Sequence, residues 1–367
     1  MNIRKLLSTF KRGHNQRLAE LVSRMVNRID QAHSTNDLVA VIREVGAFDE
    51  SLRYNLIVPG LILIPLWVVF LFGFSLLVNG PPDWGWIAWL FDYLNAKFVG
   101  LCILFPMSFV NVLYTSSVVR LAGEVSTLSR YIVERYLHLT YQISEVQPDA
   151  GMQLSWLAAT FKDFSRGTKD FFDGYKQYLA VALSGIYRGQ FETFTYSYHH
   201  LRYTIKRSSA SEDELDRYSL TVEFPWVKEV TVRGEFWGSV DREVRWKTSN
   251  TRFNRRFMLT GSREDVCEGF ARSEMLECCL KLAACLKGMN MEFSDTGYLC
   301  LSFDNDLMEI RTWHTLHNAK AFEAEMQEGF RWPLLDLTLG QLERMRALYM
   351  QAPSTCRSKG RLETTDT

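Results

Sequence analysis

Two long apolar segments dominate the hydropathy pattern of this chain. Residues 54–78 and 98–119 contain no charged side chain and consist mostly of Leu, Ile, Val, Phe and Trp. A helix of about 20 apolar residues crosses the roughly 30 Å hydrocarbon core of a bilayer. The pattern therefore predicts a two-helix transmembrane hairpin over residues 54–119, in preference to two buried helices of a large soluble protein. The connection at residues 79–97 is rich in Trp and Tyr, which favours a short external loop at the headgroup level.

Basic residues predict the orientation of this hairpin. Residues 1–53 carry nine Lys or Arg, the external loop carries only Lys97, and Arg120, Arg130 and Arg135 follow the second segment closely. Positively charged flanks remain on the cytoplasmic side of a membrane. We therefore expect a multi-pass protein of the cell (inner) membrane with both termini in the cytoplasm.

An amphipathic helical pattern flanks the hairpin on each side. Residues 1–53 contain one apolar stripe, and a polar cluster from Ser34 to Asp37 supplies cap chemistry for a second short helix. Residues 120–150 predict a stalk helix with a second stripe. A basic helix could lie on anionic lipid, but we favour packing of the two stripes together, because acidic residues dilute the basic face. The stripes consist of Leu18, Leu21, Val22, Met25 and Ile29, and of Val125, Leu128, Ile132, Leu139 and Ile143.

Residues 151–350 predict a cytoplasmic α+β domain with an antiparallel sheet. Residues 191–206 and 217–224 are rich in aromatic and β-branched side chains and flank a polar turn at 207–216, so they predict a long hairpin. The parity of the apolar positions changes at His199-His200, which indicates a β-bulge there. The polar residues 351–367 predict a disordered tail. Further strands are predicted near 230–232, 256–259, 291–293 and 298–303, and helices near 152–164, 275–286, 319–327 and 338–349.

Four motifs in this domain carry a resemblance to a known family. They are FKDFSRG at 161–167, LSGIYRGQFETFTYSYH at 183–199, FNRRFMLTG at 253–261 and GYLCLSF at 297–303. In this order they resemble a family of uncharacterised bacterial membrane-anchored proteins with a C-terminal domain of unknown function, over about residues 155–330. The chain has Phe194-Thr195-Tyr196 where such strands often carry an acidic Phe-Asp-Tyr. The resemblance implies an architecture and no catalytic residue.

Charge and cysteine content narrow the function classes. The 42 Lys and Arg balance the 42 Asp and Glu, so net charge gives no argument for nucleic-acid binding. The seven cysteines show no paired spacing, which favours free thiols in a reducing compartment. Cysteines at apolar positions of helices and strands behave as small hydrophobic side chains, so we favour this over a catalytic thiol. The cysteines considered for such a role are Cys267, Cys278, Cys279, Cys285 and Cys300.

No motif predicts a catalytic, cofactor-binding or metal-binding residue. His314 and His317 have helical spacing for a shared metal, but no Cys or carboxylate at ligand spacing accompanies them, so a surface pair is favoured. Residues 304–306 resemble the start of a calcium loop, but the glycine and the glutamate that such a loop needs are missing. The turn predicted at Gly185 to Gly189 is not a phosphate loop, because no Lys-Ser or Lys-Thr follows it.

A basic cluster at residues 242–256 is the densest concentration of charge. Arg242, Arg245, Lys247, Arg252, Arg255 and Arg256 are opposed only by Asp241 and Glu243. Such a cluster can meet anionic lipid headgroups or a nucleic acid. The favoured interpretation is a solvated strand edge that its charge protects from aggregation.

These observations favour a non-enzymatic sensing or scaffolding module at the cytoplasmic membrane face. The alternative is a membrane-anchored, hydrolase-like enzyme whose site is assembled from dispersed residues such as His199, His200 or His314. A channel or transporter is disfavoured, because two helices without an intramembrane charge would need many copies to assemble. The expected partners are the lipid bilayer, other proteins or further copies bound through the helices, and anionic lipid at residues 242–256. No small-molecule cofactor is expected.

Overall fold

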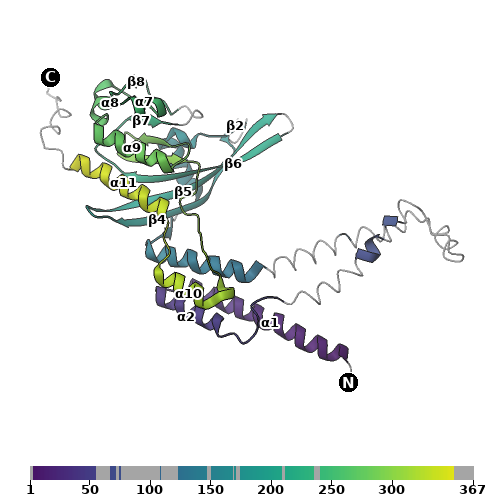
Figure 1. Ribbon diagram of the computed structural model, residues 1–367. Coiled ribbons are helices and arrows are strands. Elements are labelled where there is room, and N and C mark those ends of the chain that lie inside the picture. Colours follow the sequence, from purple (N-terminus) through teal and green to yellow (C-terminus); the bar gives the residue numbers. More distant parts are fainter. Residues whose placement is uncertain are drawn as a thin grey trace. The chain divides into compact units, whose positions relative to one another are not determined.

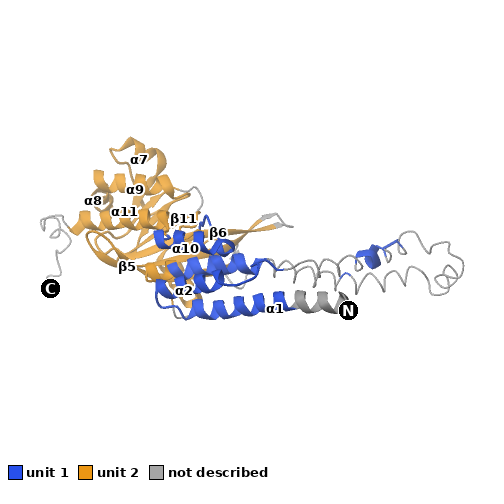
Figure 2. Ribbon diagram, turned by 60° about the horizontal axis from the view of Figure 1, so that its bottom comes forward, with its two compact units in different colours: residues 1–136, 311–330 blue, residues 137–310, 331–367 orange. Residues whose placement is uncertain are grey.

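The computed structural model describes most of the chain outside the apolar segments. The described residues are 3–54, 67–71, 74–75, 108, 123–146, 150–167, 169–170, 174–208, 211–234 and 240–350, with only the backbone for 3–12, 169–170, 174–175, 207–208 and 211. They form two compact units (Figure 2). Unit 1 comprises residues 1–136 and 311–330, and unit 2 comprises residues 137–310 and 331–367. The sequence predicts one continuous domain at 151–350, whereas the structure groups residues 311–330 with the N-terminal helices.

Unit 1 is helical. Helix α2 begins at a capping box, in which Ser34 and Asp37 satisfy each other's backbone N–H groups as predicted. A Cβ atom added at Gly46 would lie 2.9 Å from the Cβ of Ala319, so α2 and α10 are in close contact. The helical elements of this unit are α1 (Ile3–Asp30), α2 (Thr35–Gly46), helical residues 123–136, η2 (Leu316–Asn318) and α10 (Ala319–Glu328), shown in Figure 1.

The two predicted apolar stripes meet in unit 1. Arg135 donates hydrogen bonds of 3.2 and 2.7 Å to the carbonyl oxygen of Ala32, and Tyr131 donates to Asp30, the last residue of α1. The prediction that α1 packs against the predicted stalk helix is therefore confirmed. That helix ends at residue 140, before Gln142 with its positive φ of 52°, so the predicted stalk to residue 150 is too long. The buried stripe residues are Leu18, Leu21, Met25, Ile29, Val125, Leu128 and Ile132.

Unit 2 contains an antiparallel sheet of nine strands, which confirms the predicted α+β class. The strand order is β1-β4-β5-β6-β11-β10-β7-β9-β8. The strands of the sheet are β1 (Ser144–Glu145), β4 (Gln177–Arg188), β5 (Thr193–Ser208), β6 (Ser211–Glu223), β7 (Val230–Arg233), β8 (Val244–Trp246), β9 (Met258–Gly261), β10 (Asn290–Phe293) and β11 (Tyr298–Phe303). Strands β2 (Lys169–Asp170) and β3 (Gly174–Tyr175) form a separate pair.

Helices cover both faces of this sheet. On one face Cys279 of α9 lies 3.8 Å from Met291 of β10, and the Arg346 guanidinium of α11 lies 4.9 Å from the Phe194 ring. On the other face Leu157 and Phe161 pack with Leu201 and other apolar side chains. The helices of unit 2 are α6 (Ala150–Thr160), η1 (Lys162–Phe164), α7 (Thr251–Arg256), α8 (Glu264–Phe270), α9 (Ser273–Cys285) and α11 (Pro333–Met350).

The predicted hairpin is present, but the predicted bulge at His199-His200 is wrong. The ladder between β5 and β6 runs without interruption from Tyr196 to Lys206, and the predicted turn at 207–216 is mostly strand. The irregularity instead lies in β4, between Leu179 and Val181. The parity changes because both faces of β5 are buried: the face of Phe194 by α11, and that of Leu201 by α6 and η1.

Most of the predicted hairpin, its loop at 79–97 and the predicted tail at 351–367 lie outside the described residues. Within the described part of the chain, no helix is both long and apolar enough to cross a membrane. Residues 67–71 and 74–75 are helical. Five of their large apolar side chains are 38–60% exposed, namely Trp67, Val68, Val69, Leu71 and Phe74, whereas Phe70 is partly buried.

Candidate functional site

One face of the sheet in unit 2 is polar and nevertheless buried. Alternate residues of β5, β6, β10 and β11 point to this face, as the register of the strands requires. Each of these side chains is at most 5% exposed. Burying polar groups is costly unless they are hydrogen-bonded, so their partners decide what this face can do. The polar residues of this face are His199, Arg217, Ser219, Thr221, Asn290, Glu292 and Ser302.

Asp163 of η1 is the centre of a charge cluster on this face. Its carboxylate accepts hydrogen bonds of 3.0 and 3.3 Å from Arg217, one of 2.7 Å from Arg166, and one from Ser302. Arg217 also donates to the carbonyl oxygen of Gly288 at 2.8 Å. Burial alone would raise the pKa of Asp163, but the charges of Arg217 and Arg166 outweigh it and lower this pKa. Asp163 is therefore a buried carboxylate neutralised by two guanidinium groups.

Glu292 of β10 fixes η1 to the sheet. Its carboxylate accepts the backbone N–H groups of Lys162 and Asp163 at 2.9 and 2.8 Å. Burial, followed by the negative charge of Asp163, raises the pKa of Glu292 to about 7. A strongly shifted pKa is common at functional sites, but structural ion pairs produce it as well. The side chain is 4% exposed, so a substrate does not reach it.

His199 lies on the same face and is sealed from solvent. Its Nε2 lies 2.9 Å from the amide nitrogen of Gln153, and its Nδ1 lies 3.4 Å from the Ser219 hydroxyl. Burial lowers the pKa of His199 to about 3, so the ring is neutral at physiological pH. Burial likewise raises the pKa of the neighbouring Cys300 thiol. Neither group can meet a substrate in this conformation, so both belong to the packed interior of unit 2.

The two histidines of the hydrolase alternative that lie in unit 2 do not share one site. His199 and His200 point to opposite faces of β5. His200 pairs with Asp216 at 2.6 Å and stacks on Tyr218 with the ring centroids 4.5 Å apart. His314 belongs to unit 1, whereas the other two belong to unit 2.

The remaining motif residues have structural places. His317 lines the groove described below and His314 a smaller hollow, so they do not share one site. Among the described residues, no group of three or more His, Cys, Asp or Glu side chains could hold a metal ion. Asp304 pairs with Arg217 at 2.5 Å, and Asp306 accepts from Tyr198. Of the candidate cysteines, Cys267, Cys278, Cys279 and Cys300 are buried and Cys285 is partly buried.

The basic cluster at 242–256 lies at the edge of the sheet, because β8 is the last strand. Arg242 and Arg256 donate to the carbonyl oxygens of Phe293 and Ala283, so they are occupied within unit 2. The other basic side chains of the cluster are exposed. This placement fits the predicted charge-protected strand edge.

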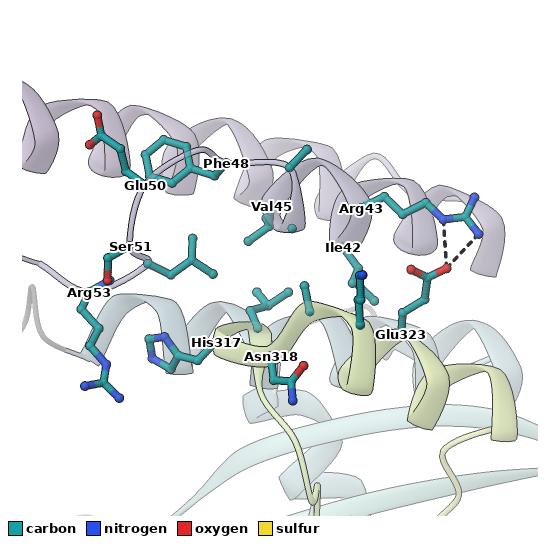
Figure 3. A pocket seen from close by; sticks show the side chains of 16 residues that line it. Ile42, Arg43, Val45, Phe48, Glu50, Ser51, Arg53, His317, Asn318 and Glu323 are labelled. Carbon is teal, nitrogen blue, oxygen red and sulfur yellow. Dashed lines mark hydrogen bonds and ion pairs between the residues drawn. The ribbon is translucent and has the colours of Figure 1, made fainter.

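An open groove in unit 1 is the second candidate site. It has a volume of about 640 Å3 and is lined by the carboxyl end of α2, residues 47–53, η2 and the first turn of α10. In Figure 3, Arg53 and His317 lie beside each other at one end, and the pair of Arg43 and Glu323 closes the other end. Val45 contributes to an apolar wall. The groove therefore combines an apolar surface with charged side chains that solvent can reach.

The cationic side chains of this groove differ in whether they have a partner. Arg43 is paired with Glu323 at 2.8 Å. Arg53, His317 and Lys320 are exposed, and none of their side chains has a hydrogen-bond or ionic partner among the described residues.

The sequence alone predicted neither the polar face of unit 2 nor the groove of unit 1. The strand segments RYSLT, NME and CLS each place polar residues at alternate positions, which was the available signal for the polar face. That signal does not show whether the face meets solvent. Nothing local indicates that residue 53 lines the same groove as residues 317 and 320, because this arrangement depends on packing of distant helices.

Comparisons with known proteins give no relative for this chain. We found no family model, no curated protein and no solved structure that matches it.

Proposed function

We propose that this chain is a membrane-anchored, non-enzymatic module that binds a ligand or partner at the cytoplasmic membrane face. The observation that carries the proposal is the contrast in accessibility between the two candidate sites. The polar face of the sheet in unit 2, which includes Asp163, His199 and Glu292, is buried and held by protein partners. Unit 1 offers an open groove in which cations remain without such partners among the described residues.

Membrane anchoring through residues 54–119 is part of this proposal. The described residues within the first apolar segment support it, since Trp67, Val68 and Leu71 expose about half of their surface or more. Exposed apolar helical side chains are unfavourable in water and favourable in lipid.

A protein partner is a further part of the proposal. Trp313 of unit 1 is 92% exposed, and its backbone N–H is held at 2.8 Å by Glu325. A large aromatic ring presented on a fixed loop is common at recognition surfaces. Partner proteins or further copies of the chain can bind there.

Anchoring and orientation are tested together in cells. The full chain should stay in the membrane fraction after an alkaline carbonate wash. A reporter that is active only outside the cytoplasm should work when inserted near Asp83 and fail after Gln147. Release of the chain by carbonate would contradict anchoring, and the reverse reporter pattern would contradict the orientation.

A further inference from the structure

The groove of unit 1 has a charge imbalance that its contacts explain. Glu50 pairs with His14 and Arg17, and Glu323 pairs with Arg43, so both acidic side chains of the groove are neutralised. Arg53 and Lys320 add two further positive charges. His317 adds a ring N–H group that can donate a hydrogen bond. Because both carboxylates are paired, while Arg53 and Lys320 have no ionic partner among the described residues, the groove favours an anionic ligand.

The helix ends at the groove act in opposite directions. The amino end of α10 carries partial positive charge, and Asn318 already caps it by accepting from Ala321. The carboxyl end of α2 carries partial negative charge. Each of these partial charges amounts to about half an elementary charge, and they oppose each other. The full charges of Arg53 and Lys320 therefore decide the sign of the groove.

The shape and the position of the groove select the kind of anion. Arg53 directly precedes the first apolar segment, so under the proposed anchoring its guanidinium lies where that segment leaves the membrane. The groove also has an apolar wall, in which Phe48 and Leu52 are partly exposed. Guanidinium and ammonium groups suit phosphate, and the apolar wall suits the glycerol and acyl portion of a lipid. A small soluble anion would leave this wall unused.

We propose that the groove between α2, residues 47–53 and the start of α10 binds the phosphate-bearing headgroup of an anionic phospholipid, held by Arg53 and Lys320. His317 lies beside Arg53 and adds a donor to the phosphate (Figure 3). The inference rests on the proposed membrane anchoring. It gives the binding module a ligand class and places that ligand on the anchor side of unit 1.

The test uses the purified full chain in detergent, titrated with phosphatidylglycerol or phosphatidylcholine and read by native mass spectrometry. Replacing both cations, R53Q with K320Q, should weaken phosphatidylglycerol binding about twentyfold and leave phosphatidylcholine binding unchanged, since each cation near an anionic lipid surface contributes a several-fold factor. The charge-conserving variant R53K with K320R should retain most of the affinity. The matched control R24Q with R130Q removes the same charge from exposed positions of unit 1 that do not line the groove, and should change binding less than twofold.

Three results would overturn the inference. One is equal binding of the two lipids by the native chain. Another is an equal loss in R53Q with K320Q and in R24Q with R130Q. The third is displacement of phosphatidylglycerol by millimolar inorganic phosphate, which would make the groove a site for free phosphate. Retention in carbonate-washed membranes is measured on the same variants, so loss of anchoring is distinguishable from loss of lipid selectivity.

Discussion

The charge cluster of unit 2 and the groove of unit 1 hold similar side chains in opposite circumstances. Arg217 is 2% exposed and donates to Asp163, Gly288 and Ser302. Arg53 is exposed, and its side chain has no partner among the described residues. In unit 2 the charges hold η1 on the sheet, whereas in unit 1 the apolar stripes carry the packing and several charges remain at the rim.

A concentration of titratable groups is therefore a weak sign of function. The cluster around Asp163 and Glu292 has the shifted pKa values expected of an active site, yet protein atoms occupy its hydrogen-bonding groups. A buried charge that loses its partner is costly, so the members of such a cluster hold one another in place whether or not the cluster has a function. An exposed cation without a partner costs little to remove and is free to bind a ligand.

The comparison is tested most strongly by the same substitution in both regions. Arg217→Met leaves Asp163 and Asp304 without their main cation and should lower the free energy of unfolding by about 4 kcal/mol. Arg53→Met should change it by less than about 0.5 kcal/mol, because its charge is exposed. Denaturant unfolding of the full chain in detergent measures both. Equal effects of the two substitutions would remove the distinction between the regions.

The apolar packing of unit 1 is tested at α1. Leu21→Ala removes a side chain that is 4% exposed and should lower the free energy of unfolding by about 3 kcal/mol. Arg24→Ala, on the exposed face of the same helix, should lower it by less than about 0.5 kcal/mol. Both variants should remain in the membrane fraction. A small effect of Leu21→Ala would show that the stripe is not a source of stability.

Stability should depend on pH through Glu292. The pKa of about 7 in the folded chain lies above the value of 4.5 for a free side chain, so the folded state binds more protons between these values. Stability from this group is therefore complete below about pH 4.5 and decreases as the pH rises to 7. Glutamine at position 292 cannot titrate. Between pH 5 and 8 the unfolding free energy of Glu292→Gln should therefore fall by about 2–3 kcal/mol less than that of the native chain. The exposed substitution Glu212→Gln should keep the slope, and an unchanged slope in Glu292→Gln would contradict this account.

The smallest expected effect concerns the cap of α2, whose carboxyl end forms one side of the groove. Ser34→Ala removes the hydroxyl that accepts from the Asp37 backbone N–H and should cost about 1 kcal/mol of unfolding free energy. Ser249→Ala, at an exposed loop position, serves as the control and should cost less than half as much. Equal thermal shifts in the two variants would mean that the cap does not stabilise α2.

The sequence predicted the secondary-structure elements that interactions between neighbouring residues determine. The stripe from Leu18 to Ile29, the cap at Ser34 and the β5–β6 hairpin were all readable, because helical spacing, side-chain capping and alternation act over a few residues. Strand β4 was missed because Gly185 and Gly189 indicated a turn. Gly185 is required inside the strand, since a Cβ there would lie 2.4 Å from the Tyr196 ring.

The candidate sites depend on contacts between distant segments. The polar face could be predicted as a face, but its burial depends on η1, whose residues 162–164 lie far from β10 in the sequence. The groove depends on α2 meeting α10, which no local pattern specifies.

Residue-resolved chemical labelling tests the central contrast most directly. The full chain in nanodiscs is treated with phenylglyoxal, which modifies arginine, and with an acetylating reagent for lysine, and the modified peptides are quantified by mass spectrometry. In phosphatidylcholine, Arg53 and Lys320 should be modified readily while Arg166 and Arg217 remain unmodified, and added phosphatidylglycerol should protect Arg53 and Lys320 alone. Modification of Arg217 at the rate of Arg53, or no protection of Arg53 by phosphatidylglycerol, would contradict the account.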